Sequence, residues 1–447
     1  MDQCTTITKI QSFLEKALQN QLGEFIELCN SGDLYNFEEQ LWQVVLDLYD
    51  LTAQCVLSSS SDQIEGELRE KGRKTGLRKL ESRPVSVQIR TGHYVKVQGL
   101  YARQVPRGYP GKRQLLSAHW KLLKGASPSY YSTIGLFSVV SPSFEVASHI
   151  LAVQGVEHNR DRLQKLCYAL GQRCKDHQAE LSRRPGETLK GKRVLIGIDG
   201  GRTRMRQYTG NKNAAGNARF NTPWMEPKMF VIEVLDDKGN LDRRELPLYG
   251  CLFGDDEVFD LLDQHLKGLD IDQAEQVQVV ADGAPWIWNR GKQRLIVLGV
   301  SAEKIVETVD FYHASEYVHK IVAGLPRKLK KKASGILKDF KQWLWEGNIQ
   351  SIVDQCGQYF SNPTPEIQRY IGYLDKNKER MTYQHFRDQK LVCGSGVIES
   401  GIRRVINLRF KNASAFWNPK NVEMLYFLRA TLLAFRWNTL MDNLVAA

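Results

Sequence analysis

The chain has 447 residues, of which 42% are apolar, and it carries a net charge of +12. The apolar share is sufficient for a folded core and excludes wholesale disorder, while the length predicts two to four structural units. So large a positive charge favours a polyanionic partner, either nucleic acid or an acidic membrane surface, with a merely basic protein as the alternative.

Cysteine usage and the lack of long apolar runs narrow the class of protein further. The eight cysteines are scattered with no CxxC pair, which argues against a zinc ribbon and against a disulfide framework. No eighteen consecutive residues are apolar, and the N-terminal segment has no apolar signal core. The sequence therefore predicts a cytoplasmic protein with reduced thiols and no membrane-spanning segment.

The sequence predicts a helical region first and a β-rich module after it. In residues 1–85, apolar side chains recur at helical spacing, which predicts an N-terminal helical region. Residues 86–140 form the next module, in which an alternating pattern predicts a β-hairpin turning at Thr91 and Gly92. The stretch 105–135 is rich in Pro, Gly and Ser, and we expect it to be irregular.

Residues 141–185 predict a pair of helices. Two helical patterns flank Gly155, and a short turn containing glycine between two helices is the layout of a helix-turn-helix. Basic residues at Arg160, Arg162 and Lys165 favour a second helix that contacts DNA. An ordinary helical hairpin explains the same pattern, so both interpretations stay open.

From residue 190 the pattern changes to that of an α/β domain. Residues 190–325 predict three strands followed by a helix, a strand, a helix, a strand and a helix. This is the element order of an RNase H-like core, a mixed sheet with helices on its faces. Residues 326–390 predict a basic helical insertion, and residues 391–447 predict the last part of the core with C-terminal helices.

Two predicted strands of this core end in an aspartate that is followed by glycine. Asp199 closes the apolar run of "RVLIGID", and Asp282 follows the run "QVQVVA". Ligands of open α/β sheets gather outside the strand ends, and a glycine there leaves room for their approach. Carboxylates clustered at such a place repel one another unless a divalent cation lies between them.

A third carboxylate, Glu399, is expected from a helix that packs on the sheet. It lies beside an apolar stripe that includes Ile398, Ile402 and Val405. Mg²⁺ and Mn²⁺ prefer oxygen ligands, and two such ions can bracket a phosphodiester. Taken singly, each aspartate is better explained as a turn residue, and Glu399 as a solvated partner of Arg403. The three acids together, in this order, predict a two-metal site.

The same residues carry a resemblance to a known family. The motifs "GIDGGR", "ADGAPWIW", "DFYHASEYV" and "GSGVIESGIRRVINLRFKNASAFW" resemble those of RNase H-like DDE transposases of bacterial insertion sequences, close to the Kra-type group. The resemblance covers Val194 to the C-terminus well and residues 143–173 loosely. It implies that Asp199, Asp282 and Glu399 are the catalytic residues and also the ligands of two Mg²⁺ or Mn²⁺ ions.

The resemblance also implies the reaction and the partners. Water would cleave the phosphodiester at the end of the element, and the freed 3′-OH would then attack target DNA. The expected partner is double-stranded DNA, as terminal inverted repeats and as target. A homodimer or a larger assembly would bind it, in the bacterial cytoplasm and associated with the nucleoid. A helical insertion before the last catalytic acid is implied as well.

Several residues near these motifs are expected to contact DNA. His313, in a D-x-x-H motif that starts at Asp310, would contact DNA or shape the site, with a packed histidine as the alternative. Trp417 would stack on a flipped base, with a core tryptophan as the alternative. The basic residues expected along the phosphates are Arg202, Arg204, Arg403, Arg404, Arg409 and Lys411.

One departure from the family and two rival functions complete the interpretation. Relatives often carry a cysteine-rich knuckle after the early hairpin, whereas "YARQVPRGYPGKRQ" has no cysteine, which leaves zinc in that module in doubt. A nuclease of the same fold that never joins strands is the first rival, and the basic insertion counts against it. A domesticated DNA-binding protein that no longer cuts is the second, and the three intact acids count against it.

Overall fold

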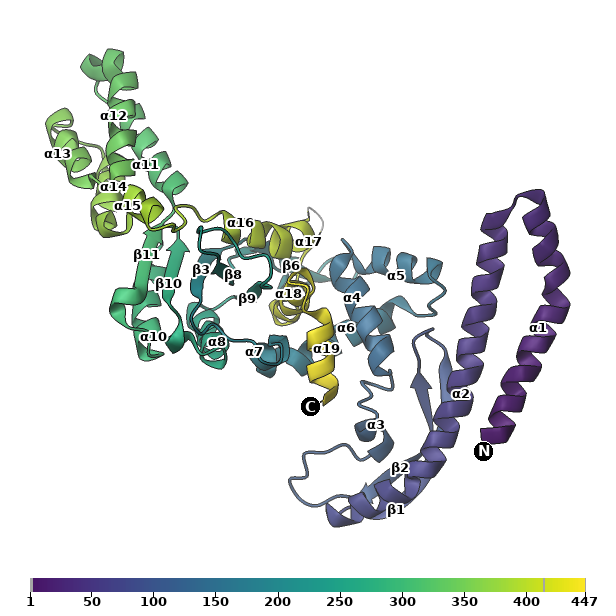
Figure 1. Ribbon diagram of the computed structural model, residues 1–447. Coiled ribbons are helices and arrows are strands. Elements are labelled where there is room, and N and C mark those ends of the chain that lie inside the picture. The colour runs from purple at the N-terminus through teal and green to yellow at the C-terminus, as the bar shows by residue number, and fades with distance from the viewer. Residues whose placement is uncertain (1–2, 413–414, 447) are drawn as a thin grey trace. The chain divides into compact units, whose positions relative to one another are not determined.

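The computed structural model describes residues 3–412 and 415–446, and the chain forms two compact units (Figure 1). Unit 1 is Met1–Arg173 with Val445–Ala447, and unit 2 is Cys174–Leu444. Across the described residues, no helix combines the length and the apolar character that a membrane span requires.

Unit 1 begins with two long helices, α1 (Gln3–Ser31) and α2 (Leu34–Lys74), which form an antiparallel hairpin (Figure 1). The side chain of Asp33 caps α2 by accepting a hydrogen bond from the backbone N–H of Asn36 at 3.2 Å. Phe25 and Phe37 then pack edge to face across the hairpin, with ring centroids 5.6 Å apart.

The β-hairpin of unit 1 turns where the alternating sequence pattern predicts. Strands β1 (Arg78–Gln88) and β2 (Tyr94–Gln104) pair antiparallel, and Gln88 opposite Tyr94 is the last pair before the turn. Buried residues of the hairpin, among them Val87 and Val97, share a core with Leu68 of α2. The prediction of a hairpin turning at Thr91 and Gly92 is confirmed.

The prediction that residues 105–135 are irregular is wrong in part, because this stretch contains helical segments. Helix α3 (Leu115–His119) is capped by the Gln114 side chain, and α4 (Pro128–Val140) is capped by Ser127, which accepts from the N–H of Tyr130 at 3.3 Å. The Ser and Pro residues that suggested a loop start α4.

Two further helices complete unit 1, α5 (Phe144–Val153) and α6 (Arg160–Cys174). Of the basic residues expected on the second helix, Arg160 and Lys165 are exposed. Arg162 is not free to meet a partner, because its guanidinium donates to the Gln88 side chain at 3.1 Å and to a backbone carbonyl at 2.6 Å.

Unit 2 is built around a five-stranded mixed sheet in the order β11-β10-β3-β8-β9. A short lead of η1 (Lys175–His177) and α7 (Gln178–Ser182) precedes it. Strands β10 and β11 run parallel to β3, whereas β8 is antiparallel to both β3 and β9. The strands are β3 (Arg193–Gly200), β8 (Lys228–Leu235), β9 (Leu248–Leu252), β10 (Gln276–Ala281) and β11 (Ile305–Val309).

Helical segments separate the later strands of the sheet. They are α8 (Asp255–Gly268), η2 (Ile271–Gln273), α9 (Pro285–Trp288), α10 (Gly291–Val297), η3 (Ala302–Lys304) and α11 (Phe311–Ala323). The chain order is therefore three sheet strands, helix, strand, helix, strand and helix, as the sequence predicts. The expectation of a mixed sheet with flanking helices is confirmed.

Four short strands between β3 and β8 were not expected from the sequence. Strand β4 (Thr203–Arg204) pairs with β7 (Trp224–Met225), and between them β5 (Gln207–Lys212) and β6 (Ala218–Asn221) form a two-stranded sheet of their own. The run lacks the long alternating pattern that marks a strand in sequence.

The helices that follow α11 form a bundle beside β11 and β10, and the chain then returns to the sheet (Figure 1). The bundle contains η4 (Arg327–Lys332), α12 (Ala333–Glu346), α13 (Ile349–Tyr359), α14 (Pro365–Lys376), η5 (Lys378–Arg380) and α15 (Tyr383–Asp388). The returning segments are α16 (Gly396–Ile402), a π-helical turn η6 (Arg403–Asn407), α17 (Leu408–Phe410), α18 (Pro419–Leu433) and α19 (Trp437–Ala446).

Candidate active site

Three aspartates stand side by side at the ends of the three parallel strands. In the register of the sheet, Ala281 of β10 lies opposite both Ile198 of β3 and Val309 of β11. The next residue on each strand is Asp199, Asp282 or Asp310. Because neighbouring strands are about 4.8 Å apart, the three carboxyl groups start from adjacent backbone positions.

The alternation of side chains along the strands sends these aspartates to one face of the sheet. Ile196 and Ile198 of β3 belong to the large core that includes α8, whereas Leu195 packs with Val397 at the start of α16. Since successive residues point to opposite faces, Asp199 shares the face of Leu195. The same alternation places Asp282 on the face of Val280, which belongs to the Leu195 cluster.

Helix α16 approaches β3 closely because residue 197 is glycine. A Cβ atom at Gly197 would lie 2.9 Å from the Cβ of Ile398, closer than packed carbon atoms come. Ile398 is fully buried at this contact, and the next residue along the helix is Glu399. The close packing therefore brings Glu399 to the face of the sheet that carries Asp199.

The electrostatics of Asp199 reflect this crowding. Burial, to which the charges of Asp282 and Glu399 add, raises the pKa of Asp199 to about 6, against a backbone hydrogen bond from Gly200 and the charge of His313. The Gly200 N–H donates to Asp199 Oδ1 at 2.6 Å. Asp282 Oδ1 likewise accepts from a backbone N–H, that of Ala284, at 2.9 Å.

Asp310 is fully buried and binds two other parts of the site. Its Oδ1 accepts from the backbone N–H of His313 at 2.7 Å and lies 3.2 Å from the His313 ring nitrogen Nδ1, while its Oδ2 accepts from the N–H of Ser395 at 2.5 Å. Although burial alone would raise it, these hydrogen bonds lower the pKa of Asp310 to about 2. Asp310 is therefore an anion that joins the start of α11 to the loop before α16.

Ser395 and His313 each bond to Asp310 and also interact with other acids of the site. The Ser395 hydroxyl donates to Glu399 Oε1 at 2.7 Å. The hydrogen bond to Asp310 raises the pKa of His313 to about 9, with the charges of Asp310 and Asp282 adding, so the ring is an imidazolium at neutral pH. The positive charge of His313 offsets part of the repulsion among the carboxylates.

The ligand atoms suited to a cation gather at this end of the sheet. One ligand atom from each of Asp310, His313 and Glu399 lies within 4.8 Å of the others. This set shares only Glu399 with the three acids expected from the sequence. Both oxygens of Asp310 already accept hydrogen bonds, whereas Asp199 and Asp282 each hold one backbone N–H, so the last two have more free acceptor capacity.

The helical bundle supplies a side wall of the same site. A Cβ atom at Gly283 would lie 1.9 Å from the Tyr373 ring, so only glycine admits that tyrosine beside Asp282. Tyr373 of α14 stacks on Tyr317 of α11, with ring centroids 3.9 Å apart. The bundle therefore packs directly against the residue that follows Asp282.

The basic residues expected to contact DNA differ in how accessible they are. Arg202, Arg403 and Lys411 are exposed. Arg204 is half-buried, and its guanidinium lies over the Trp224 ring at 4.9 Å from the centroid. The His313 side chain is 42% exposed and so can meet a partner.

Arg404, Arg409 and Trp417 contact other parts of the protein in this structure, and their expected role at the DNA stays a prediction. Arg404 donates to the Tyr249 hydroxyl. Arg409 is 2% exposed and lies 5.0 Å from the centroid of the Trp417 ring. Trp417 is 8% exposed and packs edge to face on Phe410 at 5.1 Å, so its ring offers no open face to a base.

Asp310 and Ser395 are the residues of the site whose connecting role sequence reasoning missed. The sequence assigns Asp310 only to the D-x-x-H motif. Yet "IVETVD" ends in an aspartate after an apolar strand, as "RVLIGID" does, and this signal could have placed Asp310 in the row. No sequence signal identifies Ser395, because its partner Asp310 lies 85 residues away.

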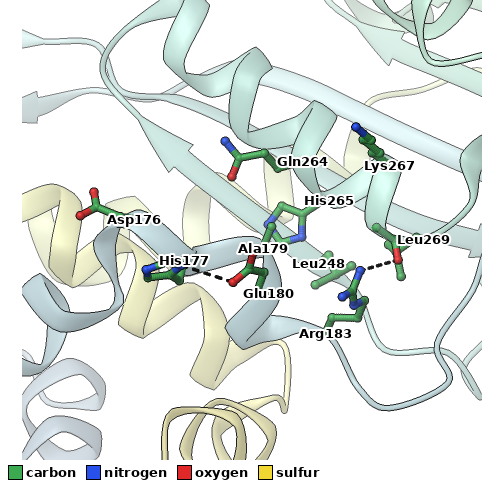
Figure 2. A pocket seen from close by; sticks show the side chains of 11 residues that line it. Asp176, His177, Ala179, Glu180, Arg183, Leu248, Gln264, His265, Lys267 and Leu269 are labelled. Atoms are coloured by element: carbon green, nitrogen blue, oxygen red, sulfur yellow. Dashed lines mark hydrogen bonds and ion pairs between the residues drawn. The ribbon is translucent and has the colours of Figure 1, made fainter. Parts of the chain in front are cut away.

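A separate cavity of about 440 Å³ lies elsewhere in unit 2 (Figure 2). None of the acids described above lines it. Its wall includes the pair His177 and Glu180, 3.3 Å apart, and Arg183, which donates to the carbonyl of Gly268 at 2.6 Å. Its charged groups are of both signs, and Figure 2 draws two contacts among the lining residues, which involve His177, Glu180 and Arg183.

Comparisons with known proteins add little to this geometry. The chain matches no protein-family model and no curated protein. Among solved structures it is similar to the Drosophila P element transposase strand transfer complex, with a TM-score of 0.33 and 10% identity, over 70% of this chain and 93% of that chain. A TM-score of this size carries no argument about this chain.

Proposed function

We propose that this chain is a DDE transposase of RNase H-like fold, of the Kra-type insertion-sequence group. In this proposal Asp199, Asp282 and Glu399 are its catalytic carboxylates. The enzyme cleaves DNA at the ends of an insertion sequence and joins the freed ends to target DNA. The order of the strands and helices in unit 2 supports the fold assignment, because it matches the order expected of an RNase H-like core.

One observation carries the proposal: acids distant in the sequence meet on one face at the carboxyl ends of parallel strands. The register of the sheet brings Asp282 beside Asp199, and Gly197 admits the helix that carries Glu399. A structural ion pair joins opposite charges. This arrangement instead gathers like charges, which together with burial raise the pKa of Asp199, as is typical of functional sites.

The residues fit a pair of hard divalent cations. Their free ligand atoms are carboxylate oxygens, the type that Mg²⁺ and Mn²⁺ prefer, and the excess negative charge is what such ions neutralise. Two divalent ions bound there would activate the attacking oxygen and stabilise the leaving oxygen of an in-line phosphodiester displacement. Asp199, Asp282 and Glu399 would hold the ions, and Asp310 would fix Glu399 through Ser395.

The remaining residues of the site would position DNA. His313, as an exposed imidazolium next to the acids, would hold a phosphate near them, and Arg202 and Arg403 would bind phosphates further along the strand. Hydrolysis at the element's end leaves a 3′-OH, which remains at the same acids and attacks a phosphodiester of target DNA. Both steps are displacements at phosphorus without a covalent enzyme intermediate.

A strand-transfer assay tests the proposal. Duplexes taken from the DNA that flanks the coding sequence, pre-cut to expose the 3′-OH, are incubated with a supercoiled plasmid and Mn²⁺. We expect joined products with wild-type protein and a loss on the order of a thousandfold with Asp199→Asn or Glu399→Gln. Asp237→Asn, which changes an exposed acid of the turn before β9, is the matched control and should retain activity.

The outcomes separate the proposal from its rivals. Cleavage of uncut ends without any joining of pre-cut ends would indicate a nuclease of the same fold. DNA binding with neither cleavage nor joining, at any Mn²⁺ concentration, would indicate a non-catalytic binding protein. Either result contradicts the proposal.

A further inference from the structure

A basic arm projects from unit 2 a few residues after Asp199. The arm is residues 207–221, in which β5 and β6 pair with each other around a turn at residues 213–217. Every residue of the arm is exposed except Phe220, which is half-buried. With about 3.4 Å of rise per residue, the six residues of β5 reach about 20 Å from their base.

The arm and its flanks carry positive charge alone. From Gly200 to Met225 the sequence has five basic residues and no acidic one. Three of the basic residues lie before the arm, and Lys212 and Arg219 lie on its strands, both exposed. The exposed polar side chains of the arm are of types that bond to phosphates and base edges, among them Gln207, Asn211 and Asn217.

The base of the arm is fixed to the returning chain after Glu399. The N–H of Arg206 donates to the carbonyl of Trp417 at 2.8 Å, and the N–H of Trp417 donates to the carbonyl of Arg204 at 3.1 Å. The ring of Phe220 packs on Phe416, with centroids 5.8 Å apart, and the Arg206 guanidinium lies over the Phe220 ring, 4.6 Å from its centroid. Trp417, which does not offer its ring to a base, thus holds the arm in place.

The far end of the arm is preformed. Asn213 Oδ1 accepts from the N–H groups of Ala215 and Asn217 at 3.0 and 2.8 Å, which closes the turn. Gly210 has a φ of 80° where the register of the two strands shifts, so the arm bends at a point that favours glycine. A shaped, exposed ribbon loses little conformational freedom when it binds.

We propose that residues 207–221 are an arm that lies in a groove of duplex DNA, with Lys212 and Arg219 on the phosphates. The inference rests on the proposed function, because it places the arm on the DNA that the acids cut. A two-stranded β-ribbon fits the major groove. A contact between two protein chains would instead call for an apolar centre, and the exposed apolar side chains of the arm are few and small apart from Tyr208.

The test compares two double variants of the full chain in their binding to a fluorescent 30-base-pair duplex over a range of salt concentrations. K212A/R219A removes two charges from the arm. The control K238A/R243A removes two exposed charges from the turn between β8 and β9. For the arm variant we expect weaker binding and a slope of log affinity against log salt that is shallower by about 1.8, since each phosphate contact contributes about 0.9. The control should keep the wild-type slope.

The outcomes distinguish failure of the arm from failure of the proposed function. If wild-type protein binds the duplex with a steep salt slope and both variants keep that slope, the arm inference is wrong and the proposed function stands. If wild-type protein does not bind DNA, the proposed function itself fails. If K212A/R219A instead shifts the DNA-free protein to a smaller species in sedimentation, with no change in DNA affinity, the arm is a contact between copies and the inference is overturned. K212Q/R219Q, which keeps the side chains polar, repeats the test should the alanine variant fold poorly.

Discussion

Two groups of charged side chains in unit 2, a buried ion pair and the row of aspartates at the strand ends, differ in how their charges are balanced. Arg436 is 1% exposed, and its guanidinium meets both carboxylate oxygens of Glu187, at 2.8 and 2.6 Å. It also donates to the backbone carbonyls of Ser182, Leu246 and Pro247. Every charge in this pair has a counter-charge and a full set of hydrogen bonds.

The row of aspartates lacks that balance. Burial and two like charges raise the pKa of Asp199, which has one backbone hydrogen bond. Burial would raise the pKa of Glu187 as well, but the hydrogen bonds and charges of Arg436 and Arg184 together hold it below its ordinary value. The Arg436–Glu187 pair therefore stabilises the fold. The aspartate row destabilises it through burial and repulsion of like charges, and a bound cation would relieve that repulsion.

Breaking the Arg436 pair should give the largest effect. We expect Arg436→Met to lower the free energy of unfolding by about 3–5 kcal/mol, because Glu187 is left buried without its partner. Urea denaturation measures this. The control is Arg244→Met, which removes an arginine whose side chain is 86% exposed and should change the free energy of unfolding little. Equal losses in the two variants would contradict the role given to the buried pair.

The neighbour of that pair, His265, makes stability depend on pH. Burial lowers the pKa of His265 to about 3, with the charge of Arg436 adding to the effect. In the unfolded chain the same group takes up a proton below about pH 6.5, so stability falls as the pH falls below that value. Between pH 7 and 5 the wild type should lose about 2 kcal/mol more than His265→Phe, which keeps the ring contact with Phe230. Urea denaturation at the two pH values measures this. Equal losses of unfolding free energy in wild type and His265→Phe would contradict the prediction.

Removing a charge from the aspartate row should raise the free energy of unfolding, whereas breaking the Arg436 pair lowers it. We expect Asp199→Asn to raise the free energy of unfolding by about 1–2 kcal/mol at pH 7 without metal, because a buried carboxylate with a raised pKa destabilises the fold when ionised. The gain should shrink towards pH 4, since wild-type Asp199 is protonated in the folded state below its pKa of about 6. If Asp199→Asn were less stable than wild type at pH 7, Asp199 would stabilise the fold and the prediction would be wrong.

The smallest effect should come from the hydroxyl that positions Glu399. Ser395→Ala removes one hydrogen bond to Glu399 Oε1, worth about 1 kcal/mol, so strand joining should fall about fivefold with little change in thermal stability. Ser400→Ala, at an exposed position of the same helix, is the control and should retain full activity. Identical rates for the two variants would show that Ser395 does not position Glu399.

The sequence predicts which residues lie at strand ends better than it predicts which side chains are buried. Asp199 and Asp282 could be found because an apolar run, an aspartate and a glycine are adjacent in the chain. Their meeting with Asp310 depends on the register of β10 with its two neighbours, which hydrophobic pattern alone does not specify. The helix start at Pro128 was missed because its Ser and Pro resemble a loop.

Some residues expected to contact DNA lie against other parts of the protein for a tertiary reason. Arg404 and Trp417 lie close to Glu399 in the sequence. Their partners are remote: Tyr249 lies 155 residues from Arg404, and Arg204 bonds Trp417 through the backbone. The basic arm was overlooked because nothing in its composition marks it as a strand pair.

The most direct test of the central claim is calorimetric titration of the DNA-free protein with Mn²⁺. If Asp199, Asp282 and Glu399 hold divalent cations together, wild-type protein takes up the ion. Asp199→Asn and Glu399→Gln should each bind it at least tenfold more weakly, while Asp237→Asn binds it as the wild type does. Equal uptake by all four proteins would contradict the account.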